Sequence, residues 1–371
     1  MISTAIQENI WQKFFTDPNI RFPAKPMLIR EIGVYHAPNG LGIQFRGGPK
    51  KLVIRGKGTD QLFTALRTVM DGNNTLEAIF NILQTDYDGN DIASILKILH
   101  AHSLLTDAEA DERSPLTSNN NLQLDYYNRI KGYTNFQADG QAIGRAIKEA
   151  KILLIGSNNL IPPLLTNLEL TGFNNVGLLY QQEASTQPYQ NYFNQAFLSE
   201  TAVTSWQQEE ILNQLHLKID DYQYTIIAFE HPNRHFLTAI NDFLINKNKT
   251  SIFFNLVENT FEIGPLVIPR TTACFTCATL RKNSYNEDAL FENIYHDGLA
   301  ARQQLSDTSI KGIDLLSTHI AAGLFVAELT KVVANHSPSQ LHNALIAYDV
   351  LNNKLTNATV LPVAGCPSCA R

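Results

Sequence analysis

The sequence KILLIGSNNL, residues 151–160, decides the fold of the larger part of this chain. Its first five residues, Lys151–Ile155, form a short apolar run that ends at a glycine, which is typical of a strand buried on both faces of a parallel sheet. Similar runs follow, separated by segments with helical periodicity. The runs occupy residues 176–180, 224–229 and 251–256, and the helical segments occupy residues 159–171, 206–215 and 236–246. This alternation predicts an α/β domain with a doubly wound parallel sheet and helices on both faces.

The residues before this domain show a different order of elements. Three short strands are predicted first, separated by turns that contain glycine and proline, at residues 28–35, 42–46 and 52–55. Three helices are predicted next, the first capped by Thr59 or Asp60, the second capped by Thr75 and the third beginning near Asp91. We expect three parts: a winged-helix-like α+β domain at residues 1–107, a polar linker at 108–142 and the α/β domain at 143–371.

Composition and charge argue against several classes of protein. The net charge of −6 and the lack of a basic run argue against binding to nucleic acid, because such proteins neutralise phosphates with lysine and arginine. The first residues, MISTAIQENIWQKFF, lack the basic and apolar regions of a signal peptide. The most apolar predicted helix, residues 315–333, carries Glu328 and Lys331, so we interpret it as a buried helix and not a membrane span. We expect a cytoplasmic protein that has no membrane partner.

The four cysteines form two C-x-x-C pairs, Cys274 with Cys277 and Cys366 with Cys369. Two residues between cysteines let a tight turn present both thiolates to one metal ion, and a second such turn completes a tetrahedral zinc site. Two disulfides, or two separate dithiols, are the alternatives. A reducing cytoplasm and the absence of a further cysteine favour zinc. Because four thiolates leave no position for water, we predict that the zinc is structural.

The glycine after the first strand of the α/β domain lies where such domains place a phosphate-binding loop. Nucleotide sites at this position use the pattern G-x-G-x-x-G, which lets the backbone approach phosphates at the start of a helix. Here only Gly156 of the pattern remains, and Pro162 and Pro163 follow in the predicted helix. The chain also lacks the motifs G-x-S-x-G and H-E-x-x-H. We therefore expect no nucleotide cofactor and no catalytic residue.

A further group of polar residues, His231, Arg234 and His235, follows the predicted strand 224–229. Ligands of open α/β sheets bind at such strand ends, so these residues are candidates for a site. Histidines in loops are more often exposed to solvent without a ligand, and we favour that interpretation.

The segment IGPLVIPRTTACFTC, residues 263–277, resembles a known family, and so does the chain end, with IAYD at 346–349 and LPVAGCPSC at 361–369. The family comprises the ThiF-like, ubiquitin-activating-type partner proteins of cyclodehydratases in azole-forming (TOMM-type) ribosomal peptide and bacteriocin biosynthesis. The resemblance covers about residues 143–371. The first domain is similar to the PqqD-like peptide-recognition element in its order of elements.

The resemblance implies a subunit that binds the leader of a ribosomally made precursor peptide and has no catalytic activity of its own. A YcaO-type cyclodehydratase would spend ATP to form azolines, and the family allows a flavin-dependent dehydrogenase as a further partner and a homodimer. An edge strand at 52–55 could pair with the extended leader, and the third helix could supply a groove. The candidate contacts are Leu52, Val53, Ile54, Ile95 and Leu99.

Two other functions compete with this one. A divergent ATP-dependent adenylating enzyme, acting on a peptide or carrier carboxylate, would have the same fold class but would need the phosphate loop. A winged-helix regulator with a metal-sensing domain would need a basic recognition helix, and the acidic charge of the chain argues against it.

Overall fold

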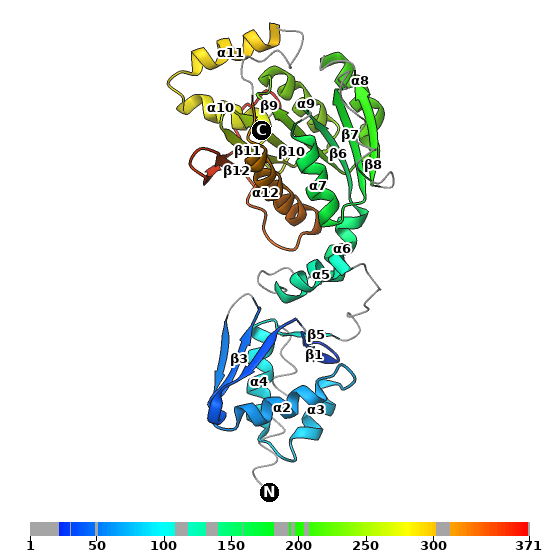
Figure 1. Cartoon of the computed structure of the whole chain (residues 1–371), viewed down its shortest axis with the longest axis vertical. Helices are drawn as coiled ribbons and strands as arrows, with labels where there is room; N and C mark the ends of the chain where they lie inside the picture. Colours follow the sequence, from blue (N-terminus) through cyan, green and yellow to red (C-terminus); the bar gives the residue numbers. More distant parts are fainter. Residues whose placement is uncertain are drawn as a thin grey trace. The chain divides into compact units, whose positions relative to one another are not determined.

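The computed structural model forms two compact units, which contain the elements labelled in Figure 1. The first unit is Met1–Gly144 with Asn335–Ser337, and the second is Arg145–Ala334 with Pro338–Arg371. The structure describes residues 22–29, 31–48, 51–107, 118–130, 140–157, 159–181, 193, 197–203, 208–301 and 312–369.

The first unit contains two small antiparallel sheets and three short helices. Strand β1 (Pro26–Leu28) pairs with β5 (Leu105–Asp107), so the single strand expected at 28–35 is divided between two sheets. The second sheet has the order β2-β3-β4, with β2 at Gly33–His36, β3 at Gly42–Arg46 and β4 at Leu52–Arg55. The helices are α2 (Thr59–Val69), α3 (Leu76–Leu83) and α4 (Gly89–Ala101).

The ends of these helices follow the expected capping chemistry only in part. Thr75 caps α3 as predicted, because its hydroxyl accepts a hydrogen bond from the N–H of Ala78. The N-cap of α2 is Gly58, at φ 82°, instead of Thr59 or Asp60. Helix α4 begins at residue 89 because Asp88 is its N-cap: the carboxylate of Asp88 accepts a hydrogen bond from the N–H of Asn90.

Helices also occupy the stretch in which the sequence predicts a linker. Helix α5 spans Ser118–Ile130, and α6 spans Gly140–Glu149. Leu124 and Tyr127, three residues apart on one face of α5, are both buried. These two residues form the apolar face of α5. The sequence does not reveal this face, because most of the surrounding residues are polar.

The second unit is built on one eight-stranded sheet with the order β13-β12-β11-β10-β9-β6-β7-β8. Five neighbouring strands, from β8 to β10, are parallel, and β10 to β13 pair antiparallel. The sheet is therefore mixed, and the prediction of a wholly parallel sheet is wrong for its last three strands. Only Glu258 and Asn259 separate β10 from β11, which is too short for a crossover helix, so the chain reverses direction. The strands are β6 (Lys151–Gly156), β7 (Asn175–Gln181), β8 (Leu198–Val203), β9 (Tyr224–Glu230), β10 (Thr250–Val257), β11 (Thr260–Val267), β12 (Ala344–Asp349) and β13 (Lys354–Thr359).

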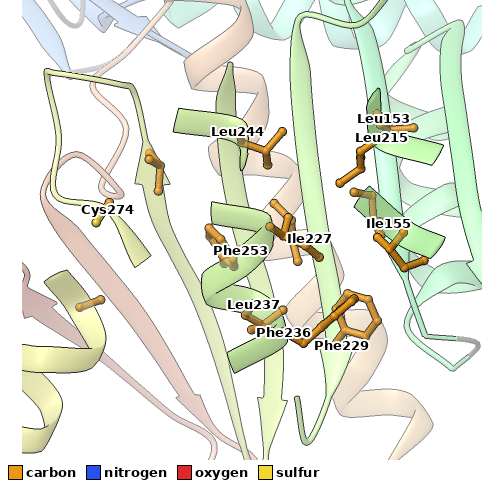
Figure 2. Close-up of a cluster of buried hydrophobic side chains, with 14 of the residues drawn as sticks. Leu153, Ile155, Leu215, Ile227, Phe229, Phe236, Leu237, Leu244, Phe253 and Cys274 are labelled. Atoms are coloured by element: carbon orange, nitrogen blue, oxygen red, sulfur yellow. The ribbon is translucent and has the colours of Figure 1, made fainter. Parts of the chain in front are cut away.

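Helices cover both faces of this sheet, because its central strands are apolar at successive positions. In β10 the ring of Phe253 stacks on Phe275 of α10 at 4.5 Å, and the next ring, Phe254, lies 5.2 Å from Phe325 of α12. Figure 2 shows the first of these faces, where α9 side chains meet strand residues near Cys274. The helices are α7 (Ile161–Thr171), α8 (Gln208–Lys218), α9 (Arg234–Asn246), α10 (Phe275–Tyr285), α11 (Ala289–Ala301) and α12 (Leu315–Ala334).

Helix α12 is the one described helix that is long and apolar enough to cross a membrane, and half of its apolar window is buried inside the protein. The carboxylate of Glu328, near its end, is buried. It forms an ion pair with Lys331 and accepts hydrogen bonds from Ser339 at 2.9 Å and from the N–H of Gln340 at 2.7 Å. These contacts are typical of a core helix.

Candidate functional site

The four cysteine sulfurs meet at one point of the second unit. The Sγ atoms of Cys274 and Cys277 are 3.7 Å apart, those of Cys274 and Cys366 are 3.7 Å apart, and those of Cys277 and Cys369 are 3.6 Å apart. All four lie within 4.8 Å of one another. A tetrahedral zinc ion with bonds of about 2.3 Å places its sulfurs about 3.8 Å apart, whereas a disulfide bond measures about 2.05 Å. The arrangement therefore suits four thiolate ligands around one metal ion and contains no disulfide among these residues.

Backbone groups orient two of these sulfurs. Cys274 is the N-cap of α10, and its Sγ accepts from the N–H of Cys277 at 3.4 Å. The Sγ of Cys277 accepts from the N–H of Val363 at 3.3 Å, which links α10 to the chain end. Gly365 adopts φ 70° immediately before Cys366, so this turn requires the left-handed conformation that glycine tolerates best. Hydrogen bonds of this kind position ligands and stabilise thiolate charge.

The environment of the thiols makes an anionic cluster costly without a cation. Burial raises the pKa of Cys274 well above its usual range and raises the pKa of Cys369 to about 11. Burial also acts on Cys277, but hydrogen bonds from the backbone of Val363 and Cys274 and from the side chains of Cys366 and Cys369 together lower the pKa of that thiol. A divalent metal would supply the positive charge that four buried thiolates need.

The loop after β6, where a nucleotide phosphate would bind in related folds, is filled by a carboxylate from the neighbouring strand. Glu230, the last residue of β9, lies with Oε2 3.1 Å from the amide Nδ2 of Asn159 and Oε1 3.4 Å from the hydroxyl of Ser157. Its own N–H donates to that hydroxyl at 3.2 Å. A negative charge here opposes the binding of a phosphate that carries no metal ion. The sequence contains its signal, a glutamate at a strand end, but only the pairing of β9 with β6 places it in this loop.

Two features beside this loop, Gly156 and the first turn of α7, can be explained by packing and backbone geometry without a bound nucleotide. A Cβ atom on Gly156 would lie 2.8 Å from the carbonyl oxygen of Ala228, so the close pairing of β6 and β9 requires glycine there. Anion sites at helix starts use free N–H groups of the first turn. In α7, Pro162 and Pro163 have none, and the N–H of Leu160 donates to Ser157. In the first turn of α7, only the N–H of Ile161 therefore remains available to an anion.

The hydrogen-bonding pattern of the β2-β3-β4 sheet can be derived from its hairpin. The N–H of Ala37 donates to the carbonyl of Gly42 at 2.9 Å, so these two residues form a hydrogen-bonded pair between β2 and β3. Such pairs alternate along an antiparallel ladder, so Gln44 also directs its N–H and C=O toward β2. Its neighbours Ile43 and Phe45 direct theirs to the other side, toward β4.

The same alternation determines which groups of β4 remain free. Ile54 and Leu52 are opposite the two β3 residues that face β4, so their N–H and C=O groups belong to the ladder. Val53 and Arg55 therefore direct their N–H and C=O groups away from β3. Among the described strands, β4 pairs only with β3, so this edge is open for an added strand.

The five residues predicted to contact a peptide differ in exposure. Leu52, Ile54, Ile95 and Leu99 are buried in the core of the first unit, whereas Val53 is 38% exposed. Residues 52 and 54 share one face of β4, and that face packs on the helices. A peptide contact at these four positions would use backbone groups or neighbouring side chains, because their own side chains are enclosed.

The structure links Arg234 and His235 to helix α11, and His231 to the turn between β10 and β11. His235 is exposed and its Nε2 lies 2.9 Å from Asp297, while Arg234 donates to the side chain of Asn293 at 3.1 Å. The prediction of a solvent-facing histidine is wrong for His231, which is 6% exposed and accepts from the N–H of Glu258 at 3.2 Å through Nδ1. Burial lowers the pKa of His231.

Comparison with known proteins identifies a shared fold. No protein-family model and no curated protein matches the chain. The crystal structure of E. coli MccB with AMPCPP and MccA is 16% identical, with a TM-score of 0.67 over 93% of this chain and 99% of that chain. MccB alone is 15% identical, with a TM-score of 0.69 over 93% and 97%. The heterocyclase TruD is 14% identical, with a TM-score of 0.59 over 94% of this chain but 43% of that chain. The chain therefore has the fold of MccB and of part of TruD.

Proposed function

We propose that the chain is a non-catalytic subunit that recognises the leader of a ribosomal precursor peptide and presents the peptide to a YcaO-type cyclodehydratase for azoline formation. The observation that carries the proposal is the edge of β4 that no other described strand pairs with, where Val53 and Arg55 direct their backbone groups outward. An extended peptide that adds a strand here gains backbone hydrogen bonds with little demand on its sequence.

The structural neighbours support a role in peptide modification. MccB is described as a microcin C7 biosynthetic enzyme, and its crystals hold MccA. The likeness to MccB spans 93% of this chain, so it includes part of both units. A related arrangement would let the first unit hold a peptide while the second unit serves as scaffold.

The match to TruD suggests where the chemistry takes place. This chain corresponds to 43% of the TruD chain, so more than half of that heterocyclase has no counterpart here. We assign ring formation to a separate YcaO-type enzyme, and any later oxidation to a flavin-dependent dehydrogenase. The chain would then act by binding, in the cytoplasm.

The cysteine cluster fits a structural zinc ion within this scaffold. Cys274, Cys277, Cys366 and Cys369 would be its ligands, and no position would remain for water or substrate. The ion would hold the chain end against the start of α10. Its role would be stability and not catalysis.

Replacement of Val53 with proline tests the peptide site. Proline removes an outward N–H but leaves the ladder between β3 and β4 intact, so the added strand loses a hydrogen bond and meets the proline ring. We expect leader affinity to fall about tenfold or more. The measurement is fluorescence polarisation of the full chain with labelled peptides taken from the short reading frames near its gene.

The matched control is Val53→Thr, which retains the N–H and the β-branched shape. It should bind within about twofold of the unmodified protein, and both variants should keep their thermal unfolding. Equal binding by Val53→Pro and Val53→Thr would place the leader elsewhere.

The alternative is an adenylating enzyme, and MccB crystals that hold ATP favour it. Against it stand the carboxylate of Glu230 in the loop and the two prolines of α7. We expect calorimetric titration of ATP with magnesium into the full chain to produce no binding heat at millimolar concentrations. MccB under the same conditions is the positive control, and micromolar affinity for this chain would favour the enzyme.

A further inference from the structure

A cavity of about 310 Å³ lies in the second unit beside the end of β9. Its walls come from the start of α9, the β10–β11 hairpin, α10 and α11. The volume falls in the range of small-molecule sites, and open α/β sheets bind ligands at the carboxyl ends of their strands. Neither the peptide edge of β4 nor the cysteine cluster accounts for this cavity.

The walls combine an apolar surface with a few polar groups. The apolar part comes from Leu237, Val257, Pro265, Phe275 and Leu345. The polar groups include Arg234, Lys282 and His296. Such a combination suits a ligand with an apolar body and one polar end.

Two of the polar groups have bonding capacity to spare. Arg234 is bonded to the side chain of Asn293 at 3.1 Å, and no carboxylate among the described residues lies within ion-pair distance of it. The Nδ1 atom of His296 is buried and has no hydrogen-bond partner in the described part of the chain. A buried polar atom without a partner is costly, and a ligand oxygen would remove that cost.

The charges around the cavity select the kind of anion. Lys282 is already paired with Glu262, and Glu258 and Glu292 also line the walls. Outside that pair, a doubly charged phosphate would face two carboxylates, Glu258 and Glu292, with one unpaired guanidinium. A single negative charge is matched by Arg234 alone, in the geometry that arginine forms with a carboxylate.

His296 lies near several cationic side chains of these walls. Burial, and then the nearby Arg234, His235 and Lys282, lower the pKa of His296 to about 4. The ring is therefore neutral near pH 7. Its Nε2 lies 3.8 Å from a carboxylate oxygen of Glu292, and Nδ1 can donate to a ligand in the tautomer that carries the proton there.

We propose that this cavity binds a small monocarboxylate with an apolar body, held by Arg234 and by Nδ1 of His296. The carboxylate would form an ion pair with the guanidinium and accept a hydrogen bond from the imidazole. The apolar body would contact Phe275 and Leu237. This site does not depend on the peptide function proposed above.

The test is titration of the full chain with 4-phenylbutanoate, followed by NMR of the histidine ring signals. We expect saturable shifts of the His296 signals. The uncharged isostere 4-phenylbutanamide should bind about tenfold or more weakly, because it cannot form the ion pair. Equal binding of the two compounds, or no saturable shift with the carboxylate, would overturn the proposal.

Arg234→Gln should weaken 4-phenylbutanoate binding about tenfold or more, while the thermal unfolding of the protein stays unchanged. His235→Gln is the matched control, because its side chain is adjacent in sequence but pairs with Asp297 and does not line the cavity. Should Arg234→Gln unfold, His296→Asn with the same two compounds decides the question. A folded variant at either position with unchanged affinity would contradict the assignment.

Discussion

Replacement of Cys366 with serine is expected to leave the purified protein without zinc and to lower its melting temperature by about 10 °C or more. The unmodified protein should contain about one zinc ion per chain, because the four sulfurs form one tetrahedral set. Metal binding free energy is folding free energy in such sites, and a loss of about 4 kcal/mol changes the melting temperature of a domain this size by roughly 8–16 °C. Elemental analysis and calorimetry measure the two quantities.

The loss of stability in Cys366→Ser should be greatest in the last residues of the described chain. Without the metal, the contacts that hold residues 360–369 include the N–H of Val363 on Cys277 and the hydrogen bond between Thr276 and Ser368. Hydrogen exchange in this segment should therefore increase. Ser368→Ala is the control for metal loss, since it removes only the hydrogen bond to Thr276 and keeps all four thiols. It should keep its zinc and most of its melting temperature. A metal-free protein with unchanged stability would exclude the structural zinc.

Ile95→Asp is expected to unfold the first unit and not merely to weaken peptide binding. The side chain of Ile95 is 5% exposed in a core that includes Leu99 and Ile54. Loss of a buried aliphatic side chain costs about 2–5 kcal/mol, and burial of a carboxylate adds several more, which together match the stability of many domains. Hydrogen exchange of the full chain should lose protection in α2, α3 and α4.

Ser94→Asp is the matched control, because it introduces the same side chain one position earlier on the exposed face of α4. It should leave the exchange pattern unchanged. If Ile95→Asp were folded and failed only in leader binding, the side chain of Ile95 would belong to the groove after all.

The sequence predicted most strands and helices because their signals are local. The apolar runs from Lys151 onward, the cap at Thr75 and the spacing of the C-x-x-C pairs each depend on residues within one turn or one strand. Strand β8 was missed, since Leu198–Val203 alternates with polar residues and has no buried run. Helix α5 lies in the predicted linker, of which only residues 124–130 were expected to be ordered, because its buried residues are few among many polar ones.

The sequence by itself determined the α/β class of the second unit and the four candidate metal ligands, because period and spacing are properties of the chain. Only the tertiary structure decided which residues meet across long intervals. It placed Glu230 in the loop after β6, and it paired β10 to β13 in antiparallel order. It also buried the side chains of Ile95 and Leu99 and left Val53 on an edge strand. It also placed Arg234 and His296 around one cavity. These outcomes depend on strand order and helix packing, which arise from contacts between distant residues that no local pattern encodes.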